Sequence, residues 1–383
     1  MNSNPSAPKP PFDLTVAAPG RINLIGEHTD YNMGYVLPAA IDKAITFRFR
    51  KVPGSKLAFF YSNTNGRELR IPLDAIARST DAWENYFLGV LSEISERVGT
   101  LQGFECLIDS DLPPGSGLSS SAALECGLAY GLNELYSLGL DPWEMITLCR
   151  DAEQQFVGMR CGIMDQFASV MGRKNQVVLL DCDTLEYSHH PLNLHPYKLL
   201  LLNSQVSHSL ADSEYNLRRE QCEEALSLFR KAYPELRSLR GVSREMLKSF
   251  RAELSPVLYN RCSFILEENE RVLAAVRAIE AGDSPALGAL LYASHEGLQY
   301  QYEVSCRELD FLVDFTRDIP EVLGSRMMGG GFGGCSLNLI HGEATDTFIS
   351  RVTEAYQRQF GLQLTSFEGI PSEGVRVLPH TTP

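Results

Sequence analysis

The sequence contains no closely spaced pair of cysteines, because its nine cysteines stand singly and no CxxC motif occurs. Disulfide frameworks and structural zinc sites are built on paired cysteines, so we expect reduced thiols, no structural zinc and a cytoplasmic location. The N-terminus, MNSNPSAPKPPFD, lacks the apolar segment of a secretion signal. No apolar run approaches the roughly 18 residues that span a bilayer, so we expect no membrane partner.

Positive charge is also scarce: 34 Lys and Arg stand against 48 Asp and Glu, which gives a net charge of −14. An acidic chain repels phosphodiester backbones, so nucleic acid is not expected as a partner, and an anionic substrate would need a local cationic or N–H-rich site. With 44% hydrophobic and 21% charged residues, the chain is suited to a sizeable core. Its 383 residues predict two or three domains, at about 150 residues each.

Hydrophobic periodicity predicts strands and helices without a regular βαβα alternation, which is typical of an α+β fold with two packed domains. Residues 1–11 are predicted to be a Pro-rich tail that need not fold, and we divide the rest at the polar stretch 181–196, into domains 12–186 and 187–383. Strand 44–50 is expected to pair with strand 57–61, and the run 197–203 is typical of a central strand. Other predicted strands are 104–110, 176–180 and 336–340, and predicted helices are 83–98, 122–138, 142–157, 213–233, 261–280, 285–298 and 308–316.

Residues 114–123, PGSGLSSSAA, lie between a predicted strand and a predicted helix. Gly115 and Gly117 let the backbone approach a ligand closely, and the unpaired N–H groups that begin the helix favour an anion such as phosphate. The segment is not a P-loop, because the lysine of GxxxxGK[ST] is absent. A serine-rich helix start without any ligand explains the same residues equally well.

A second glycine-rich segment covers 329–334 and formally satisfies GxGxxG. The residues that follow it, CSLNLI, predict a strand rather than a helix, so a dinucleotide-binding motif is excluded. Such a dense run still indicates close approach by a ligand or by backbone, or a wide turn between two strands.

Residues 19–38, PGRINLIGEHTDYNMGYVLP, place Arg21, Glu27, His28 and Asp30 within one short loop region. Carboxylates and an imidazole suit the hydroxyl groups of a polyol, because together they accept and donate several hydrogen bonds. A metal site at Glu27, His28 and Asp30, or a solvated loop, would use the same residues.

Asp165 stands between Met164 and Phe167, near the start of a predicted helix. An Asp in this setting is often a helix N-cap. It would equally suit a catalytic base or a group that stabilises charge.

Taken together, these segments resemble the galactokinases of the GHMP small-molecule kinase superfamily. The resemblance covers about 17–378 and is carried by GRINLIGEHTDYNMGYVLP, LPPGSGLSSSAALE, GIMDQFASVMG, SLADSEYNLRREQCEEA, YEVSCRELD and GSRMMGGGFGGC. It implies a mixed-sheet N-terminal domain, an α/β-sandwich-like C-terminal domain and an active site between them. It also implies ATP-dependent phosphorylation of α-D-galactose at O1 in galactose catabolism, with ATP and Mg²⁺, by a protein that we expect to be a monomer.

The resemblance further implies a role for individual residues. Asp165 and Arg21 would be catalytic, Ser121 and Glu153 would hold Mg²⁺, and Trp83 would lie near the adenine. The glycine-rich segment 329–334 would close the site from the second domain. The galactose-binding residues would be Glu27, His28, Asp30, Gly162, Asp165 and Tyr215, and the phosphate-binding residues Gly115, Ser116, Gly117, Leu118, Ser119, Ser120 and Ser121.

Two positions depart from the family pattern: Ser207 stands where Lys or Arg is common, and Met328 where Thr or Ser is frequent. Two other functions remain open. An N-acetylgalactosamine kinase would differ around Thr29 and at 32–34, which favours galactose. A galactose sensor without activity would have little need for a complete phosphate loop together with Arg21 and Asp165.

Overall fold

The computed structural model describes residues 11–113, 115–207 and 211–379, so the predicted tail lies outside it except for Pro11. Its largest sheet has six strands in the order β13-β1-β3-β6-β4-β5. In β3, Phe47 and Phe49 are buried while Arg48 and Arg50 are half-buried, which is the alternation that predicted this strand. The bounds are Leu14–Asn23 (β1), Pro38–Lys51 (β3), Leu57–Ser62 (β4), Glu68–Pro72 (β5), Phe104–Ser110 (β6) and Arg376–Val377 (β13).

The predicted pairing of 44–50 with 57–61 is wrong. Strand β6 lies between them, antiparallel to β3 and parallel to β4. Alternation identifies a half-buried strand but not its neighbour, and consecutive strands are neighbours only about two-thirds of the time.

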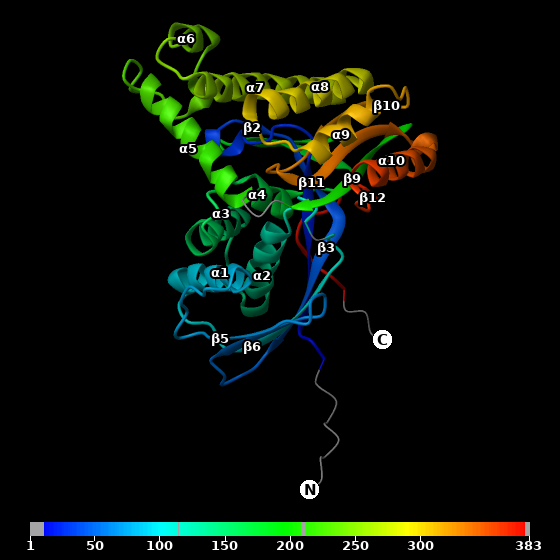
Figure 1. Cartoon of the computed structure of the whole chain (residues 1–383). Helices are drawn as coiled ribbons and strands as arrows, with labels where there is room; N and C mark the ends of the chain where they lie inside the picture. The colour runs from blue at the N-terminus through cyan, green and yellow to red at the C-terminus, as the bar shows by residue number, and fades with distance from the viewer. Residues whose placement is uncertain (1–10, 114, 208–210, 380–383) are drawn as a thin grey trace.

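Helices α2 and α4 both pack on β1 and β3, and α1 and α3 pack on α2. Figure 1 shows α1, α2 and α3 grouped beside this sheet. Gly127 and Gly131 of α2 lie so close to the Phe47 and Phe49 rings that a Cβ on either glycine would be 2.1 Å from a ring carbon. The expected helix 142–157 keeps α geometry only to Ala152, and one π-helical turn, Glu153–Val157, follows. The bounds are Ala82–Val98 (α1), Ser120–Tyr136 (α2), Pro142–Ala152 (α3) and Met164–Met171 (α4).

The second half contains a four-stranded sheet in the order β10-β11-β9-β12. The leucine run in β9 is buried on both faces: Leu199 and Leu201 join the large core, whereas Leu200 and Leu202 pack with residues of α9 (Arg307–Thr316) and α10 (Thr345–Phe360). The prediction of a central strand is therefore confirmed. The bounds are Tyr197–Ser207 (β9), Val322–Met327 (β10), Gly333–His341 (β11) and Thr365–Glu368 (β12).

Helices α7 and α8 lie at the top of the view in Figure 1, with α5 descending toward α4. The helix α10 was not predicted from the sequence. None of the helices in the described ranges combines the length and the apolar character that a bilayer crossing requires. The bounds are Ala211–Phe229 (α5), Arg244–Ser249 (α6), Pro256–Ala281 (α7), Ser284–Glu296 (α8), Arg307–Thr316 (α9) and Thr345–Phe360 (α10).

A three-stranded sheet, β2-β7-β8, joins Tyr35–Val36, Gln176–Asp181 and Tyr187–Pro191. Strands β7 and β8 pair as an antiparallel hairpin, and β13 returns from the end of the chain to pair with β1. The division at 186/187 thus falls in the turn of a hairpin and stays a prediction.

Candidate active site

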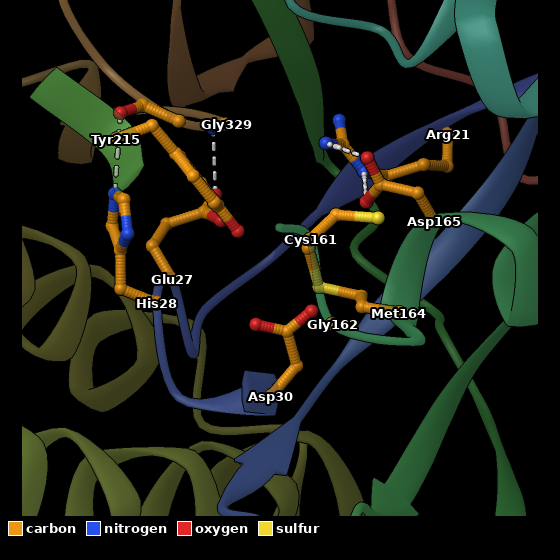
Figure 2. A pocket seen from close by; sticks show the side chains of 11 residues that line it. Arg21, Glu27, His28, Asp30, Cys161, Gly162, Met164, Asp165, Tyr215 and Gly329 are labelled. Atoms are coloured by element: carbon orange, nitrogen blue, oxygen red, sulfur yellow. Dashed lines mark hydrogen bonds and ion pairs between the residues drawn. The ribbon is translucent and has the colours of Figure 1, made fainter. Parts of the chain in front are cut away.

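Residues from four distant segments enclose one cavity of about 50 Å³. They come from β1 and the loop after it, from the start of α4 and the residues just before it, from α5 and from the glycine-rich segment that leads into β11, and Figure 2 shows their side chains converging. All six of the predicted sugar-binding residues line this cavity, and so does Arg21. The lining residues are Arg21, Glu27, His28, Asp30, Cys161, Gly162, Met164, Asp165, Tyr215, Gly329 and Gly330.

Arg21 and Asp165 form a bidentate ion pair at the cavity wall (Figure 2). The guanidinium Nε and Nη2 lie 2.7 and 3.0 Å from the two carboxylate oxygens, and the Ser119 hydroxyl donates to the carboxylate at 2.5 Å. Burial acts to lower the pKa of Arg21, but the charges of Asp165, Glu27 and Asp30, together with the hydrogen bond to Asp165, outweigh it and the pKa is raised. The N-cap of α4 is Ile163, so the interpretation of Asp165 as an N-cap is wrong.

Glu27 is 1% exposed and is held from the second half of the chain. Its Oε1 accepts a hydrogen bond from the Gly329 N–H at 2.8 Å and lies 2.9 Å from Nη2 of Arg326. Arg326, in β10, also donates to the carbonyls of Asn23 and Leu24, at 2.9 and 3.0 Å. Sequence reasoning missed Arg326, because nothing local in GSRMMGG indicates a partner 299 positions earlier (326 − 27).

His28 lies at a backbone φ of 61°, packed between aromatic rings. Its ring centroid is 5.2 Å from that of Tyr215 and 4.9 Å from that of Tyr302. Burial lowers the pKa of His28 to about 3, with Arg218 among the nearby cations that add to the effect, although the Gly330 carbonyl opposes it. The imidazole is therefore neutral at physiological pH.

Asp30 and Gly162 form one contact on the cavity wall. A Cβ added to Gly162 would stand 2.0 Å from Oδ2 of Asp30, so only glycine leaves room for the carboxylate. Burial, and then the charge of Asp165, raise the pKa of Asp30 to about 6. The carboxylate is thus ionised at neutral pH and becomes protonated on mild acidification.

We expect Gly162→Ala to raise the KM for the sugar at least tenfold, because the new methyl must displace the Asp30 carboxylate from the cavity. Steady-state kinetics measure this effect. The matched control is Gly241→Ala, whose methyl would meet only a Leu236 methyl, at 3.0 Å, and should leave KM unchanged. An unchanged KM in Gly162→Ala would show that sugar binding does not depend on the position of the Asp30 carboxylate.

Sugar affinity should fall as the pH drops through about 6, because protonation of Asp30 removes an acceptor from the cavity. The ionised fraction falls from about one half at pH 6 to about one tenth at pH 5, so Kd should rise about fivefold over that pH unit. His28 stays neutral over this range. Calorimetry with wild type and Asp30→Asn tests the assignment: the variant should bind weakly, without this pH dependence.

The predicted phosphate loop lies beside this cavity. Gly115, Gly117 and Ser119 adopt left-handed φ values of 65°, 70° and 54°, and α2 begins immediately after them. The Gly117 carbonyl accepts from Arg21 at 2.6 Å. A Cβ on Gly329 would be 3.3 Å from the same carbonyl, so the two glycine-rich segments are in contact.

A second cavity, of about 240 Å³, is lined in part by the first residues of α2. It brings together Trp83 of α1 with Ser120 and Ser121 of α2. Of the predicted nucleotide-binding residues, Trp83, Ser120 and Ser121 line this second cavity, whereas the predicted sugar-binding residues line the first.

Buried carboxylates gather behind the phosphate loop. Gln166 donates to Oε2 of Glu153 at 2.7 Å and to Glu125 at 3.3 Å, and Ser121 hydrogen-bonds Glu153. Burial and then the charge of Asp165 raise the pKa of Glu153 to about 7. Burial and then the charge of Glu153 also raise the pKa of Glu125. A bound cation would favour the ionised form of these carboxylates, whose oxygens are the ligands that a hard cation prefers.

The alternative of a metal held by Glu27, His28 and Asp30 finds no support: in the described part of the chain, no three or more His, Cys, Asp and Glu residues form a group that could hold a metal ion. Met328, one of the two residues that depart from the family pattern, has a buried side chain with 1% exposure. The side chain of Ser207 lies outside what the structure describes.

Comparisons with known proteins agree with this geometry. Three family profiles match: the galactokinase galactose-binding signature at 6–51, the GHMP kinases N terminal domain at 85–173 and the GHMP kinases C terminal domain at 275–358. Curated galactokinases of Thermosipho africanus and Thermotoga maritima are each 43% identical over 363 residues, covering 94% and 95% of this chain and 99% of each relative.

The structure is also similar to a crystal structure of Lactococcus lactis galactokinase complexed with galactose. The TM-score is 0.90 at 34% identity, with 95% of both chains covered. A mevalonate kinase, at 18% identity and a TM-score of 0.64, shares the fold alone.

Fold and site together define a GHMP kinase, which confirms the predicted α+β fold. Within that class the chain belongs to the galactokinases. It is therefore a sugar kinase, a phosphotransferase that uses ATP, as its sequence predicts.

Proposed function

We propose that the cavity of about 50 Å³ binds galactose and that the chain transfers the γ-phosphoryl group of ATP to the sugar's O1. The observation that carries this proposal is the Arg21–Asp165 pair on the wall of a cavity whose other polar groups suit sugar hydroxyls. Glu27 and Asp30 supply acceptor oxygens, and Tyr215 supplies a hydroxyl and an apolar ring face.

Asp165 is placed to take the proton of the O1 hydroxyl as that oxygen attacks the γ-phosphorus. The new O1–P bond forms while the bond from the γ-phosphorus to the bridging oxygen breaks, and the electron pair leaves with ADP. Arg21 keeps the carboxylate oriented and adds positive potential beside the reacting oxygens. Asp165 is 28% exposed in its side chain, so it remains accessible from the cavity.

The nucleotide phosphates are assigned to 115–121, where the first N–H groups of α2 and the left-handed glycines make an anion cradle. Its residues are Gly115, Ser116, Gly117, Leu118, Ser119, Ser120 and Ser121. Trp83, on the wall of the adjoining cavity, is assigned to the adenine. The glycine-rich segment 329–334 closes the site against Gly117.

Mg²⁺ is assigned to Ser121 and Glu153, supported by the hydroxyl and carboxylate oxygens that these two hydrogen-bonded residues bring together. When bound, such an ion neutralises phosphate charge. Gln166 holds the Glu153 carboxylate in place at 2.7 Å, and Glu125 lies beyond it. We further propose domains 12–186 and 187–383, a monomer, and a cytoplasmic location.

The test is the identity of the product. Wild-type protein with galactose, ATP and Mg²⁺ should give, by ³¹P NMR, one galactose phosphate ester at O1 and one ADP for each. A phosphate on another hydroxyl, or ADP release without a sugar ester, would contradict the proposal. N-acetylgalactosamine is the alternative acceptor, and the same spectrum identifies its ester.

A further inference from the structure

His28 stands at one end of a chain of hydrogen bonds that runs into the second half of the molecule. Its Nδ1 lies 2.9 Å from the Tyr31 hydroxyl, which lies 2.8 Å from the Tyr302 hydroxyl. The Tyr302 hydroxyl lies 3.1 Å from the Cys222 thiol. At the other side of the ring, Nε2 lies 3.2 Å from the Gly330 carbonyl oxygen.

The donor and the acceptor of each hydrogen bond in this series can be deduced by starting from the Gly330 carbonyl. A carbonyl oxygen only accepts, so Nε2 of His28 carries the proton toward Gly330. The neutral ring has one N–H, so Nδ1 accepts and the Tyr31 hydroxyl donates. Tyr31 has then used its proton, so Tyr302 donates to Tyr31 and Cys222 donates to Tyr302.

Two further observations support this ordering. The Asn32 amide donates to the Cys222 sulfur at 3.7 Å, which occupies a lone pair of the sulfur and leaves its S–H available to Tyr302. Tyr302 and Cys222 are 0% and 2% exposed, so water does not compete for these groups. In such a buried chain each bond polarises the next.

We propose that Tyr31, held by Tyr302 and Cys222, is a positioning residue that keeps His28 in the Nε2–H tautomer, so that His28 meets the sugar only as a hydrogen-bond donor. Both His28 and Gly330 line the cavity, and the Nε2 to Gly330 distance of 3.2 Å is at the long end for a hydrogen bond. A sugar oxygen takes the place of the carbonyl as acceptor. The inference rests on the proposed function, because it assumes that this cavity binds galactose.

The ring nitrogens can be observed directly by long-range ¹H–¹⁵N NMR of protein labelled at histidine, with His28 assigned from its absence in His28→Asn. We expect a neutral Nε2–H ring in the free protein and with galactose. An Nδ1–H ring or an imidazolium would overturn the proposal. This spectrum needs no turnover, so it tests the tautomer even if wild type fails to phosphorylate galactose, a result that would refute only the proposed function.

Kinetics of Tyr31→Phe test the positioning role. We expect KM for galactose to rise about tenfold with kcat within about twofold, because the ring loses its anchor at Nδ1 while the reacting groups are untouched. Tyr356→Phe removes another buried hydroxyl, which donates to the Ser204 carbonyl at 2.8 Å, and should leave KM unchanged. A KM within twofold of wild type in a folded Tyr31→Phe protein would overturn the proposal.

Cys222, the last residue in this series of hydrogen bonds, allows a second pair of variants. Cys222→Ser keeps a donor to Tyr302 and should retain the wild-type KM, whereas Cys222→Ala removes the donor and should raise KM about threefold. Both changes are small and lie outside the cavity lining. Equal KM values for the two variants would show that the donor at this position is not used.

Discussion

Asp165→Asn should lower kcat by a factor of about 10² to 10⁴ while galactose affinity changes by no more than a few-fold. The amide keeps the size of the side chain and a hydrogen bond from Arg21 or Ser119, but it does not take up the proton of the attacking hydroxyl. Coupled ADP release measures kcat, and calorimetry measures sugar binding. Normal turnover in Asp165→Asn would contradict the assignment.

The pH profile of the residual rate separates two roles for Asp165. If the carboxylate accepts the proton, the variant must depend on hydroxide and its rate should rise about tenfold per pH unit. If the carboxylate only stabilises charge, the residual rate should follow the wild-type profile. Asp151→Asn, which removes an ion pair with Arg150 on α3, is the matched control and should leave kcat unchanged.

Arg326→Met should destabilise the folded protein by about 3–5 kcal/mol, because it leaves the Glu27 carboxylate buried without its partner. The carbonyls of Asn23 and Leu24 lose their donor as well. Urea unfolding followed by circular dichroism measures the loss. The surviving folded protein should also bind galactose more weakly, since Glu27 is on the cavity wall.

Two further variants make the Arg326 result specific. Arg317→Met removes a cation that pairs on the surface with Glu296 and Asp314, and it should cost less than about 1 kcal/mol. Adding Glu27→Gln to Arg326→Met removes the unpaired charge and should recover part of the lost stability. Equal losses for Arg326→Met and Arg317→Met would contradict the account of a buried pair.

The elements that could be predicted from the sequence are those whose residues repeat locally. The alternation around Phe47 and Phe49 and the leucine run of β9 each reflect burial that the local sequence encodes. The strand after the glycine-rich segment was also foreseen, and its presence as β11 confirms that GxGxxG here is not a dinucleotide motif. The sequence did not predict that β4 pairs with β6, because the local pattern does not show that a strand from later in the chain lies between β3 and β4.

The candidate site divides in the same way. The sugar-facing residues lie in compact motifs, and the resemblance supplied their expected roles, whereas the groups that hold them come from far along the chain. Arg326 reaches Glu27, and Tyr302 reaches Tyr31 across 271 positions. The hydrophobic periodicity of the sequence does not predict such contacts, because they form only when the second half of the chain packs against the loop after β1. The local sequence around Arg326 and around Tyr302 does not indicate which residues they contact.

The measurement that tests the central claim most directly is coupled ADP release by the wild-type protein, with ATP and Mg²⁺, across galactose, N-acetylgalactosamine, glucose, arabinose and galacturonate. We predict that galactose is the preferred substrate, that turnover extends only to its close 2-substituted analogues, and that glucose, arabinose and galacturonate give none. Preference for N-acetylgalactosamine would contradict the sugar assignment. No turnover on any sugar, with galactose still binding by calorimetry, would contradict the assignment of Asp165 and Arg21 to catalysis and would indicate a sugar sensor.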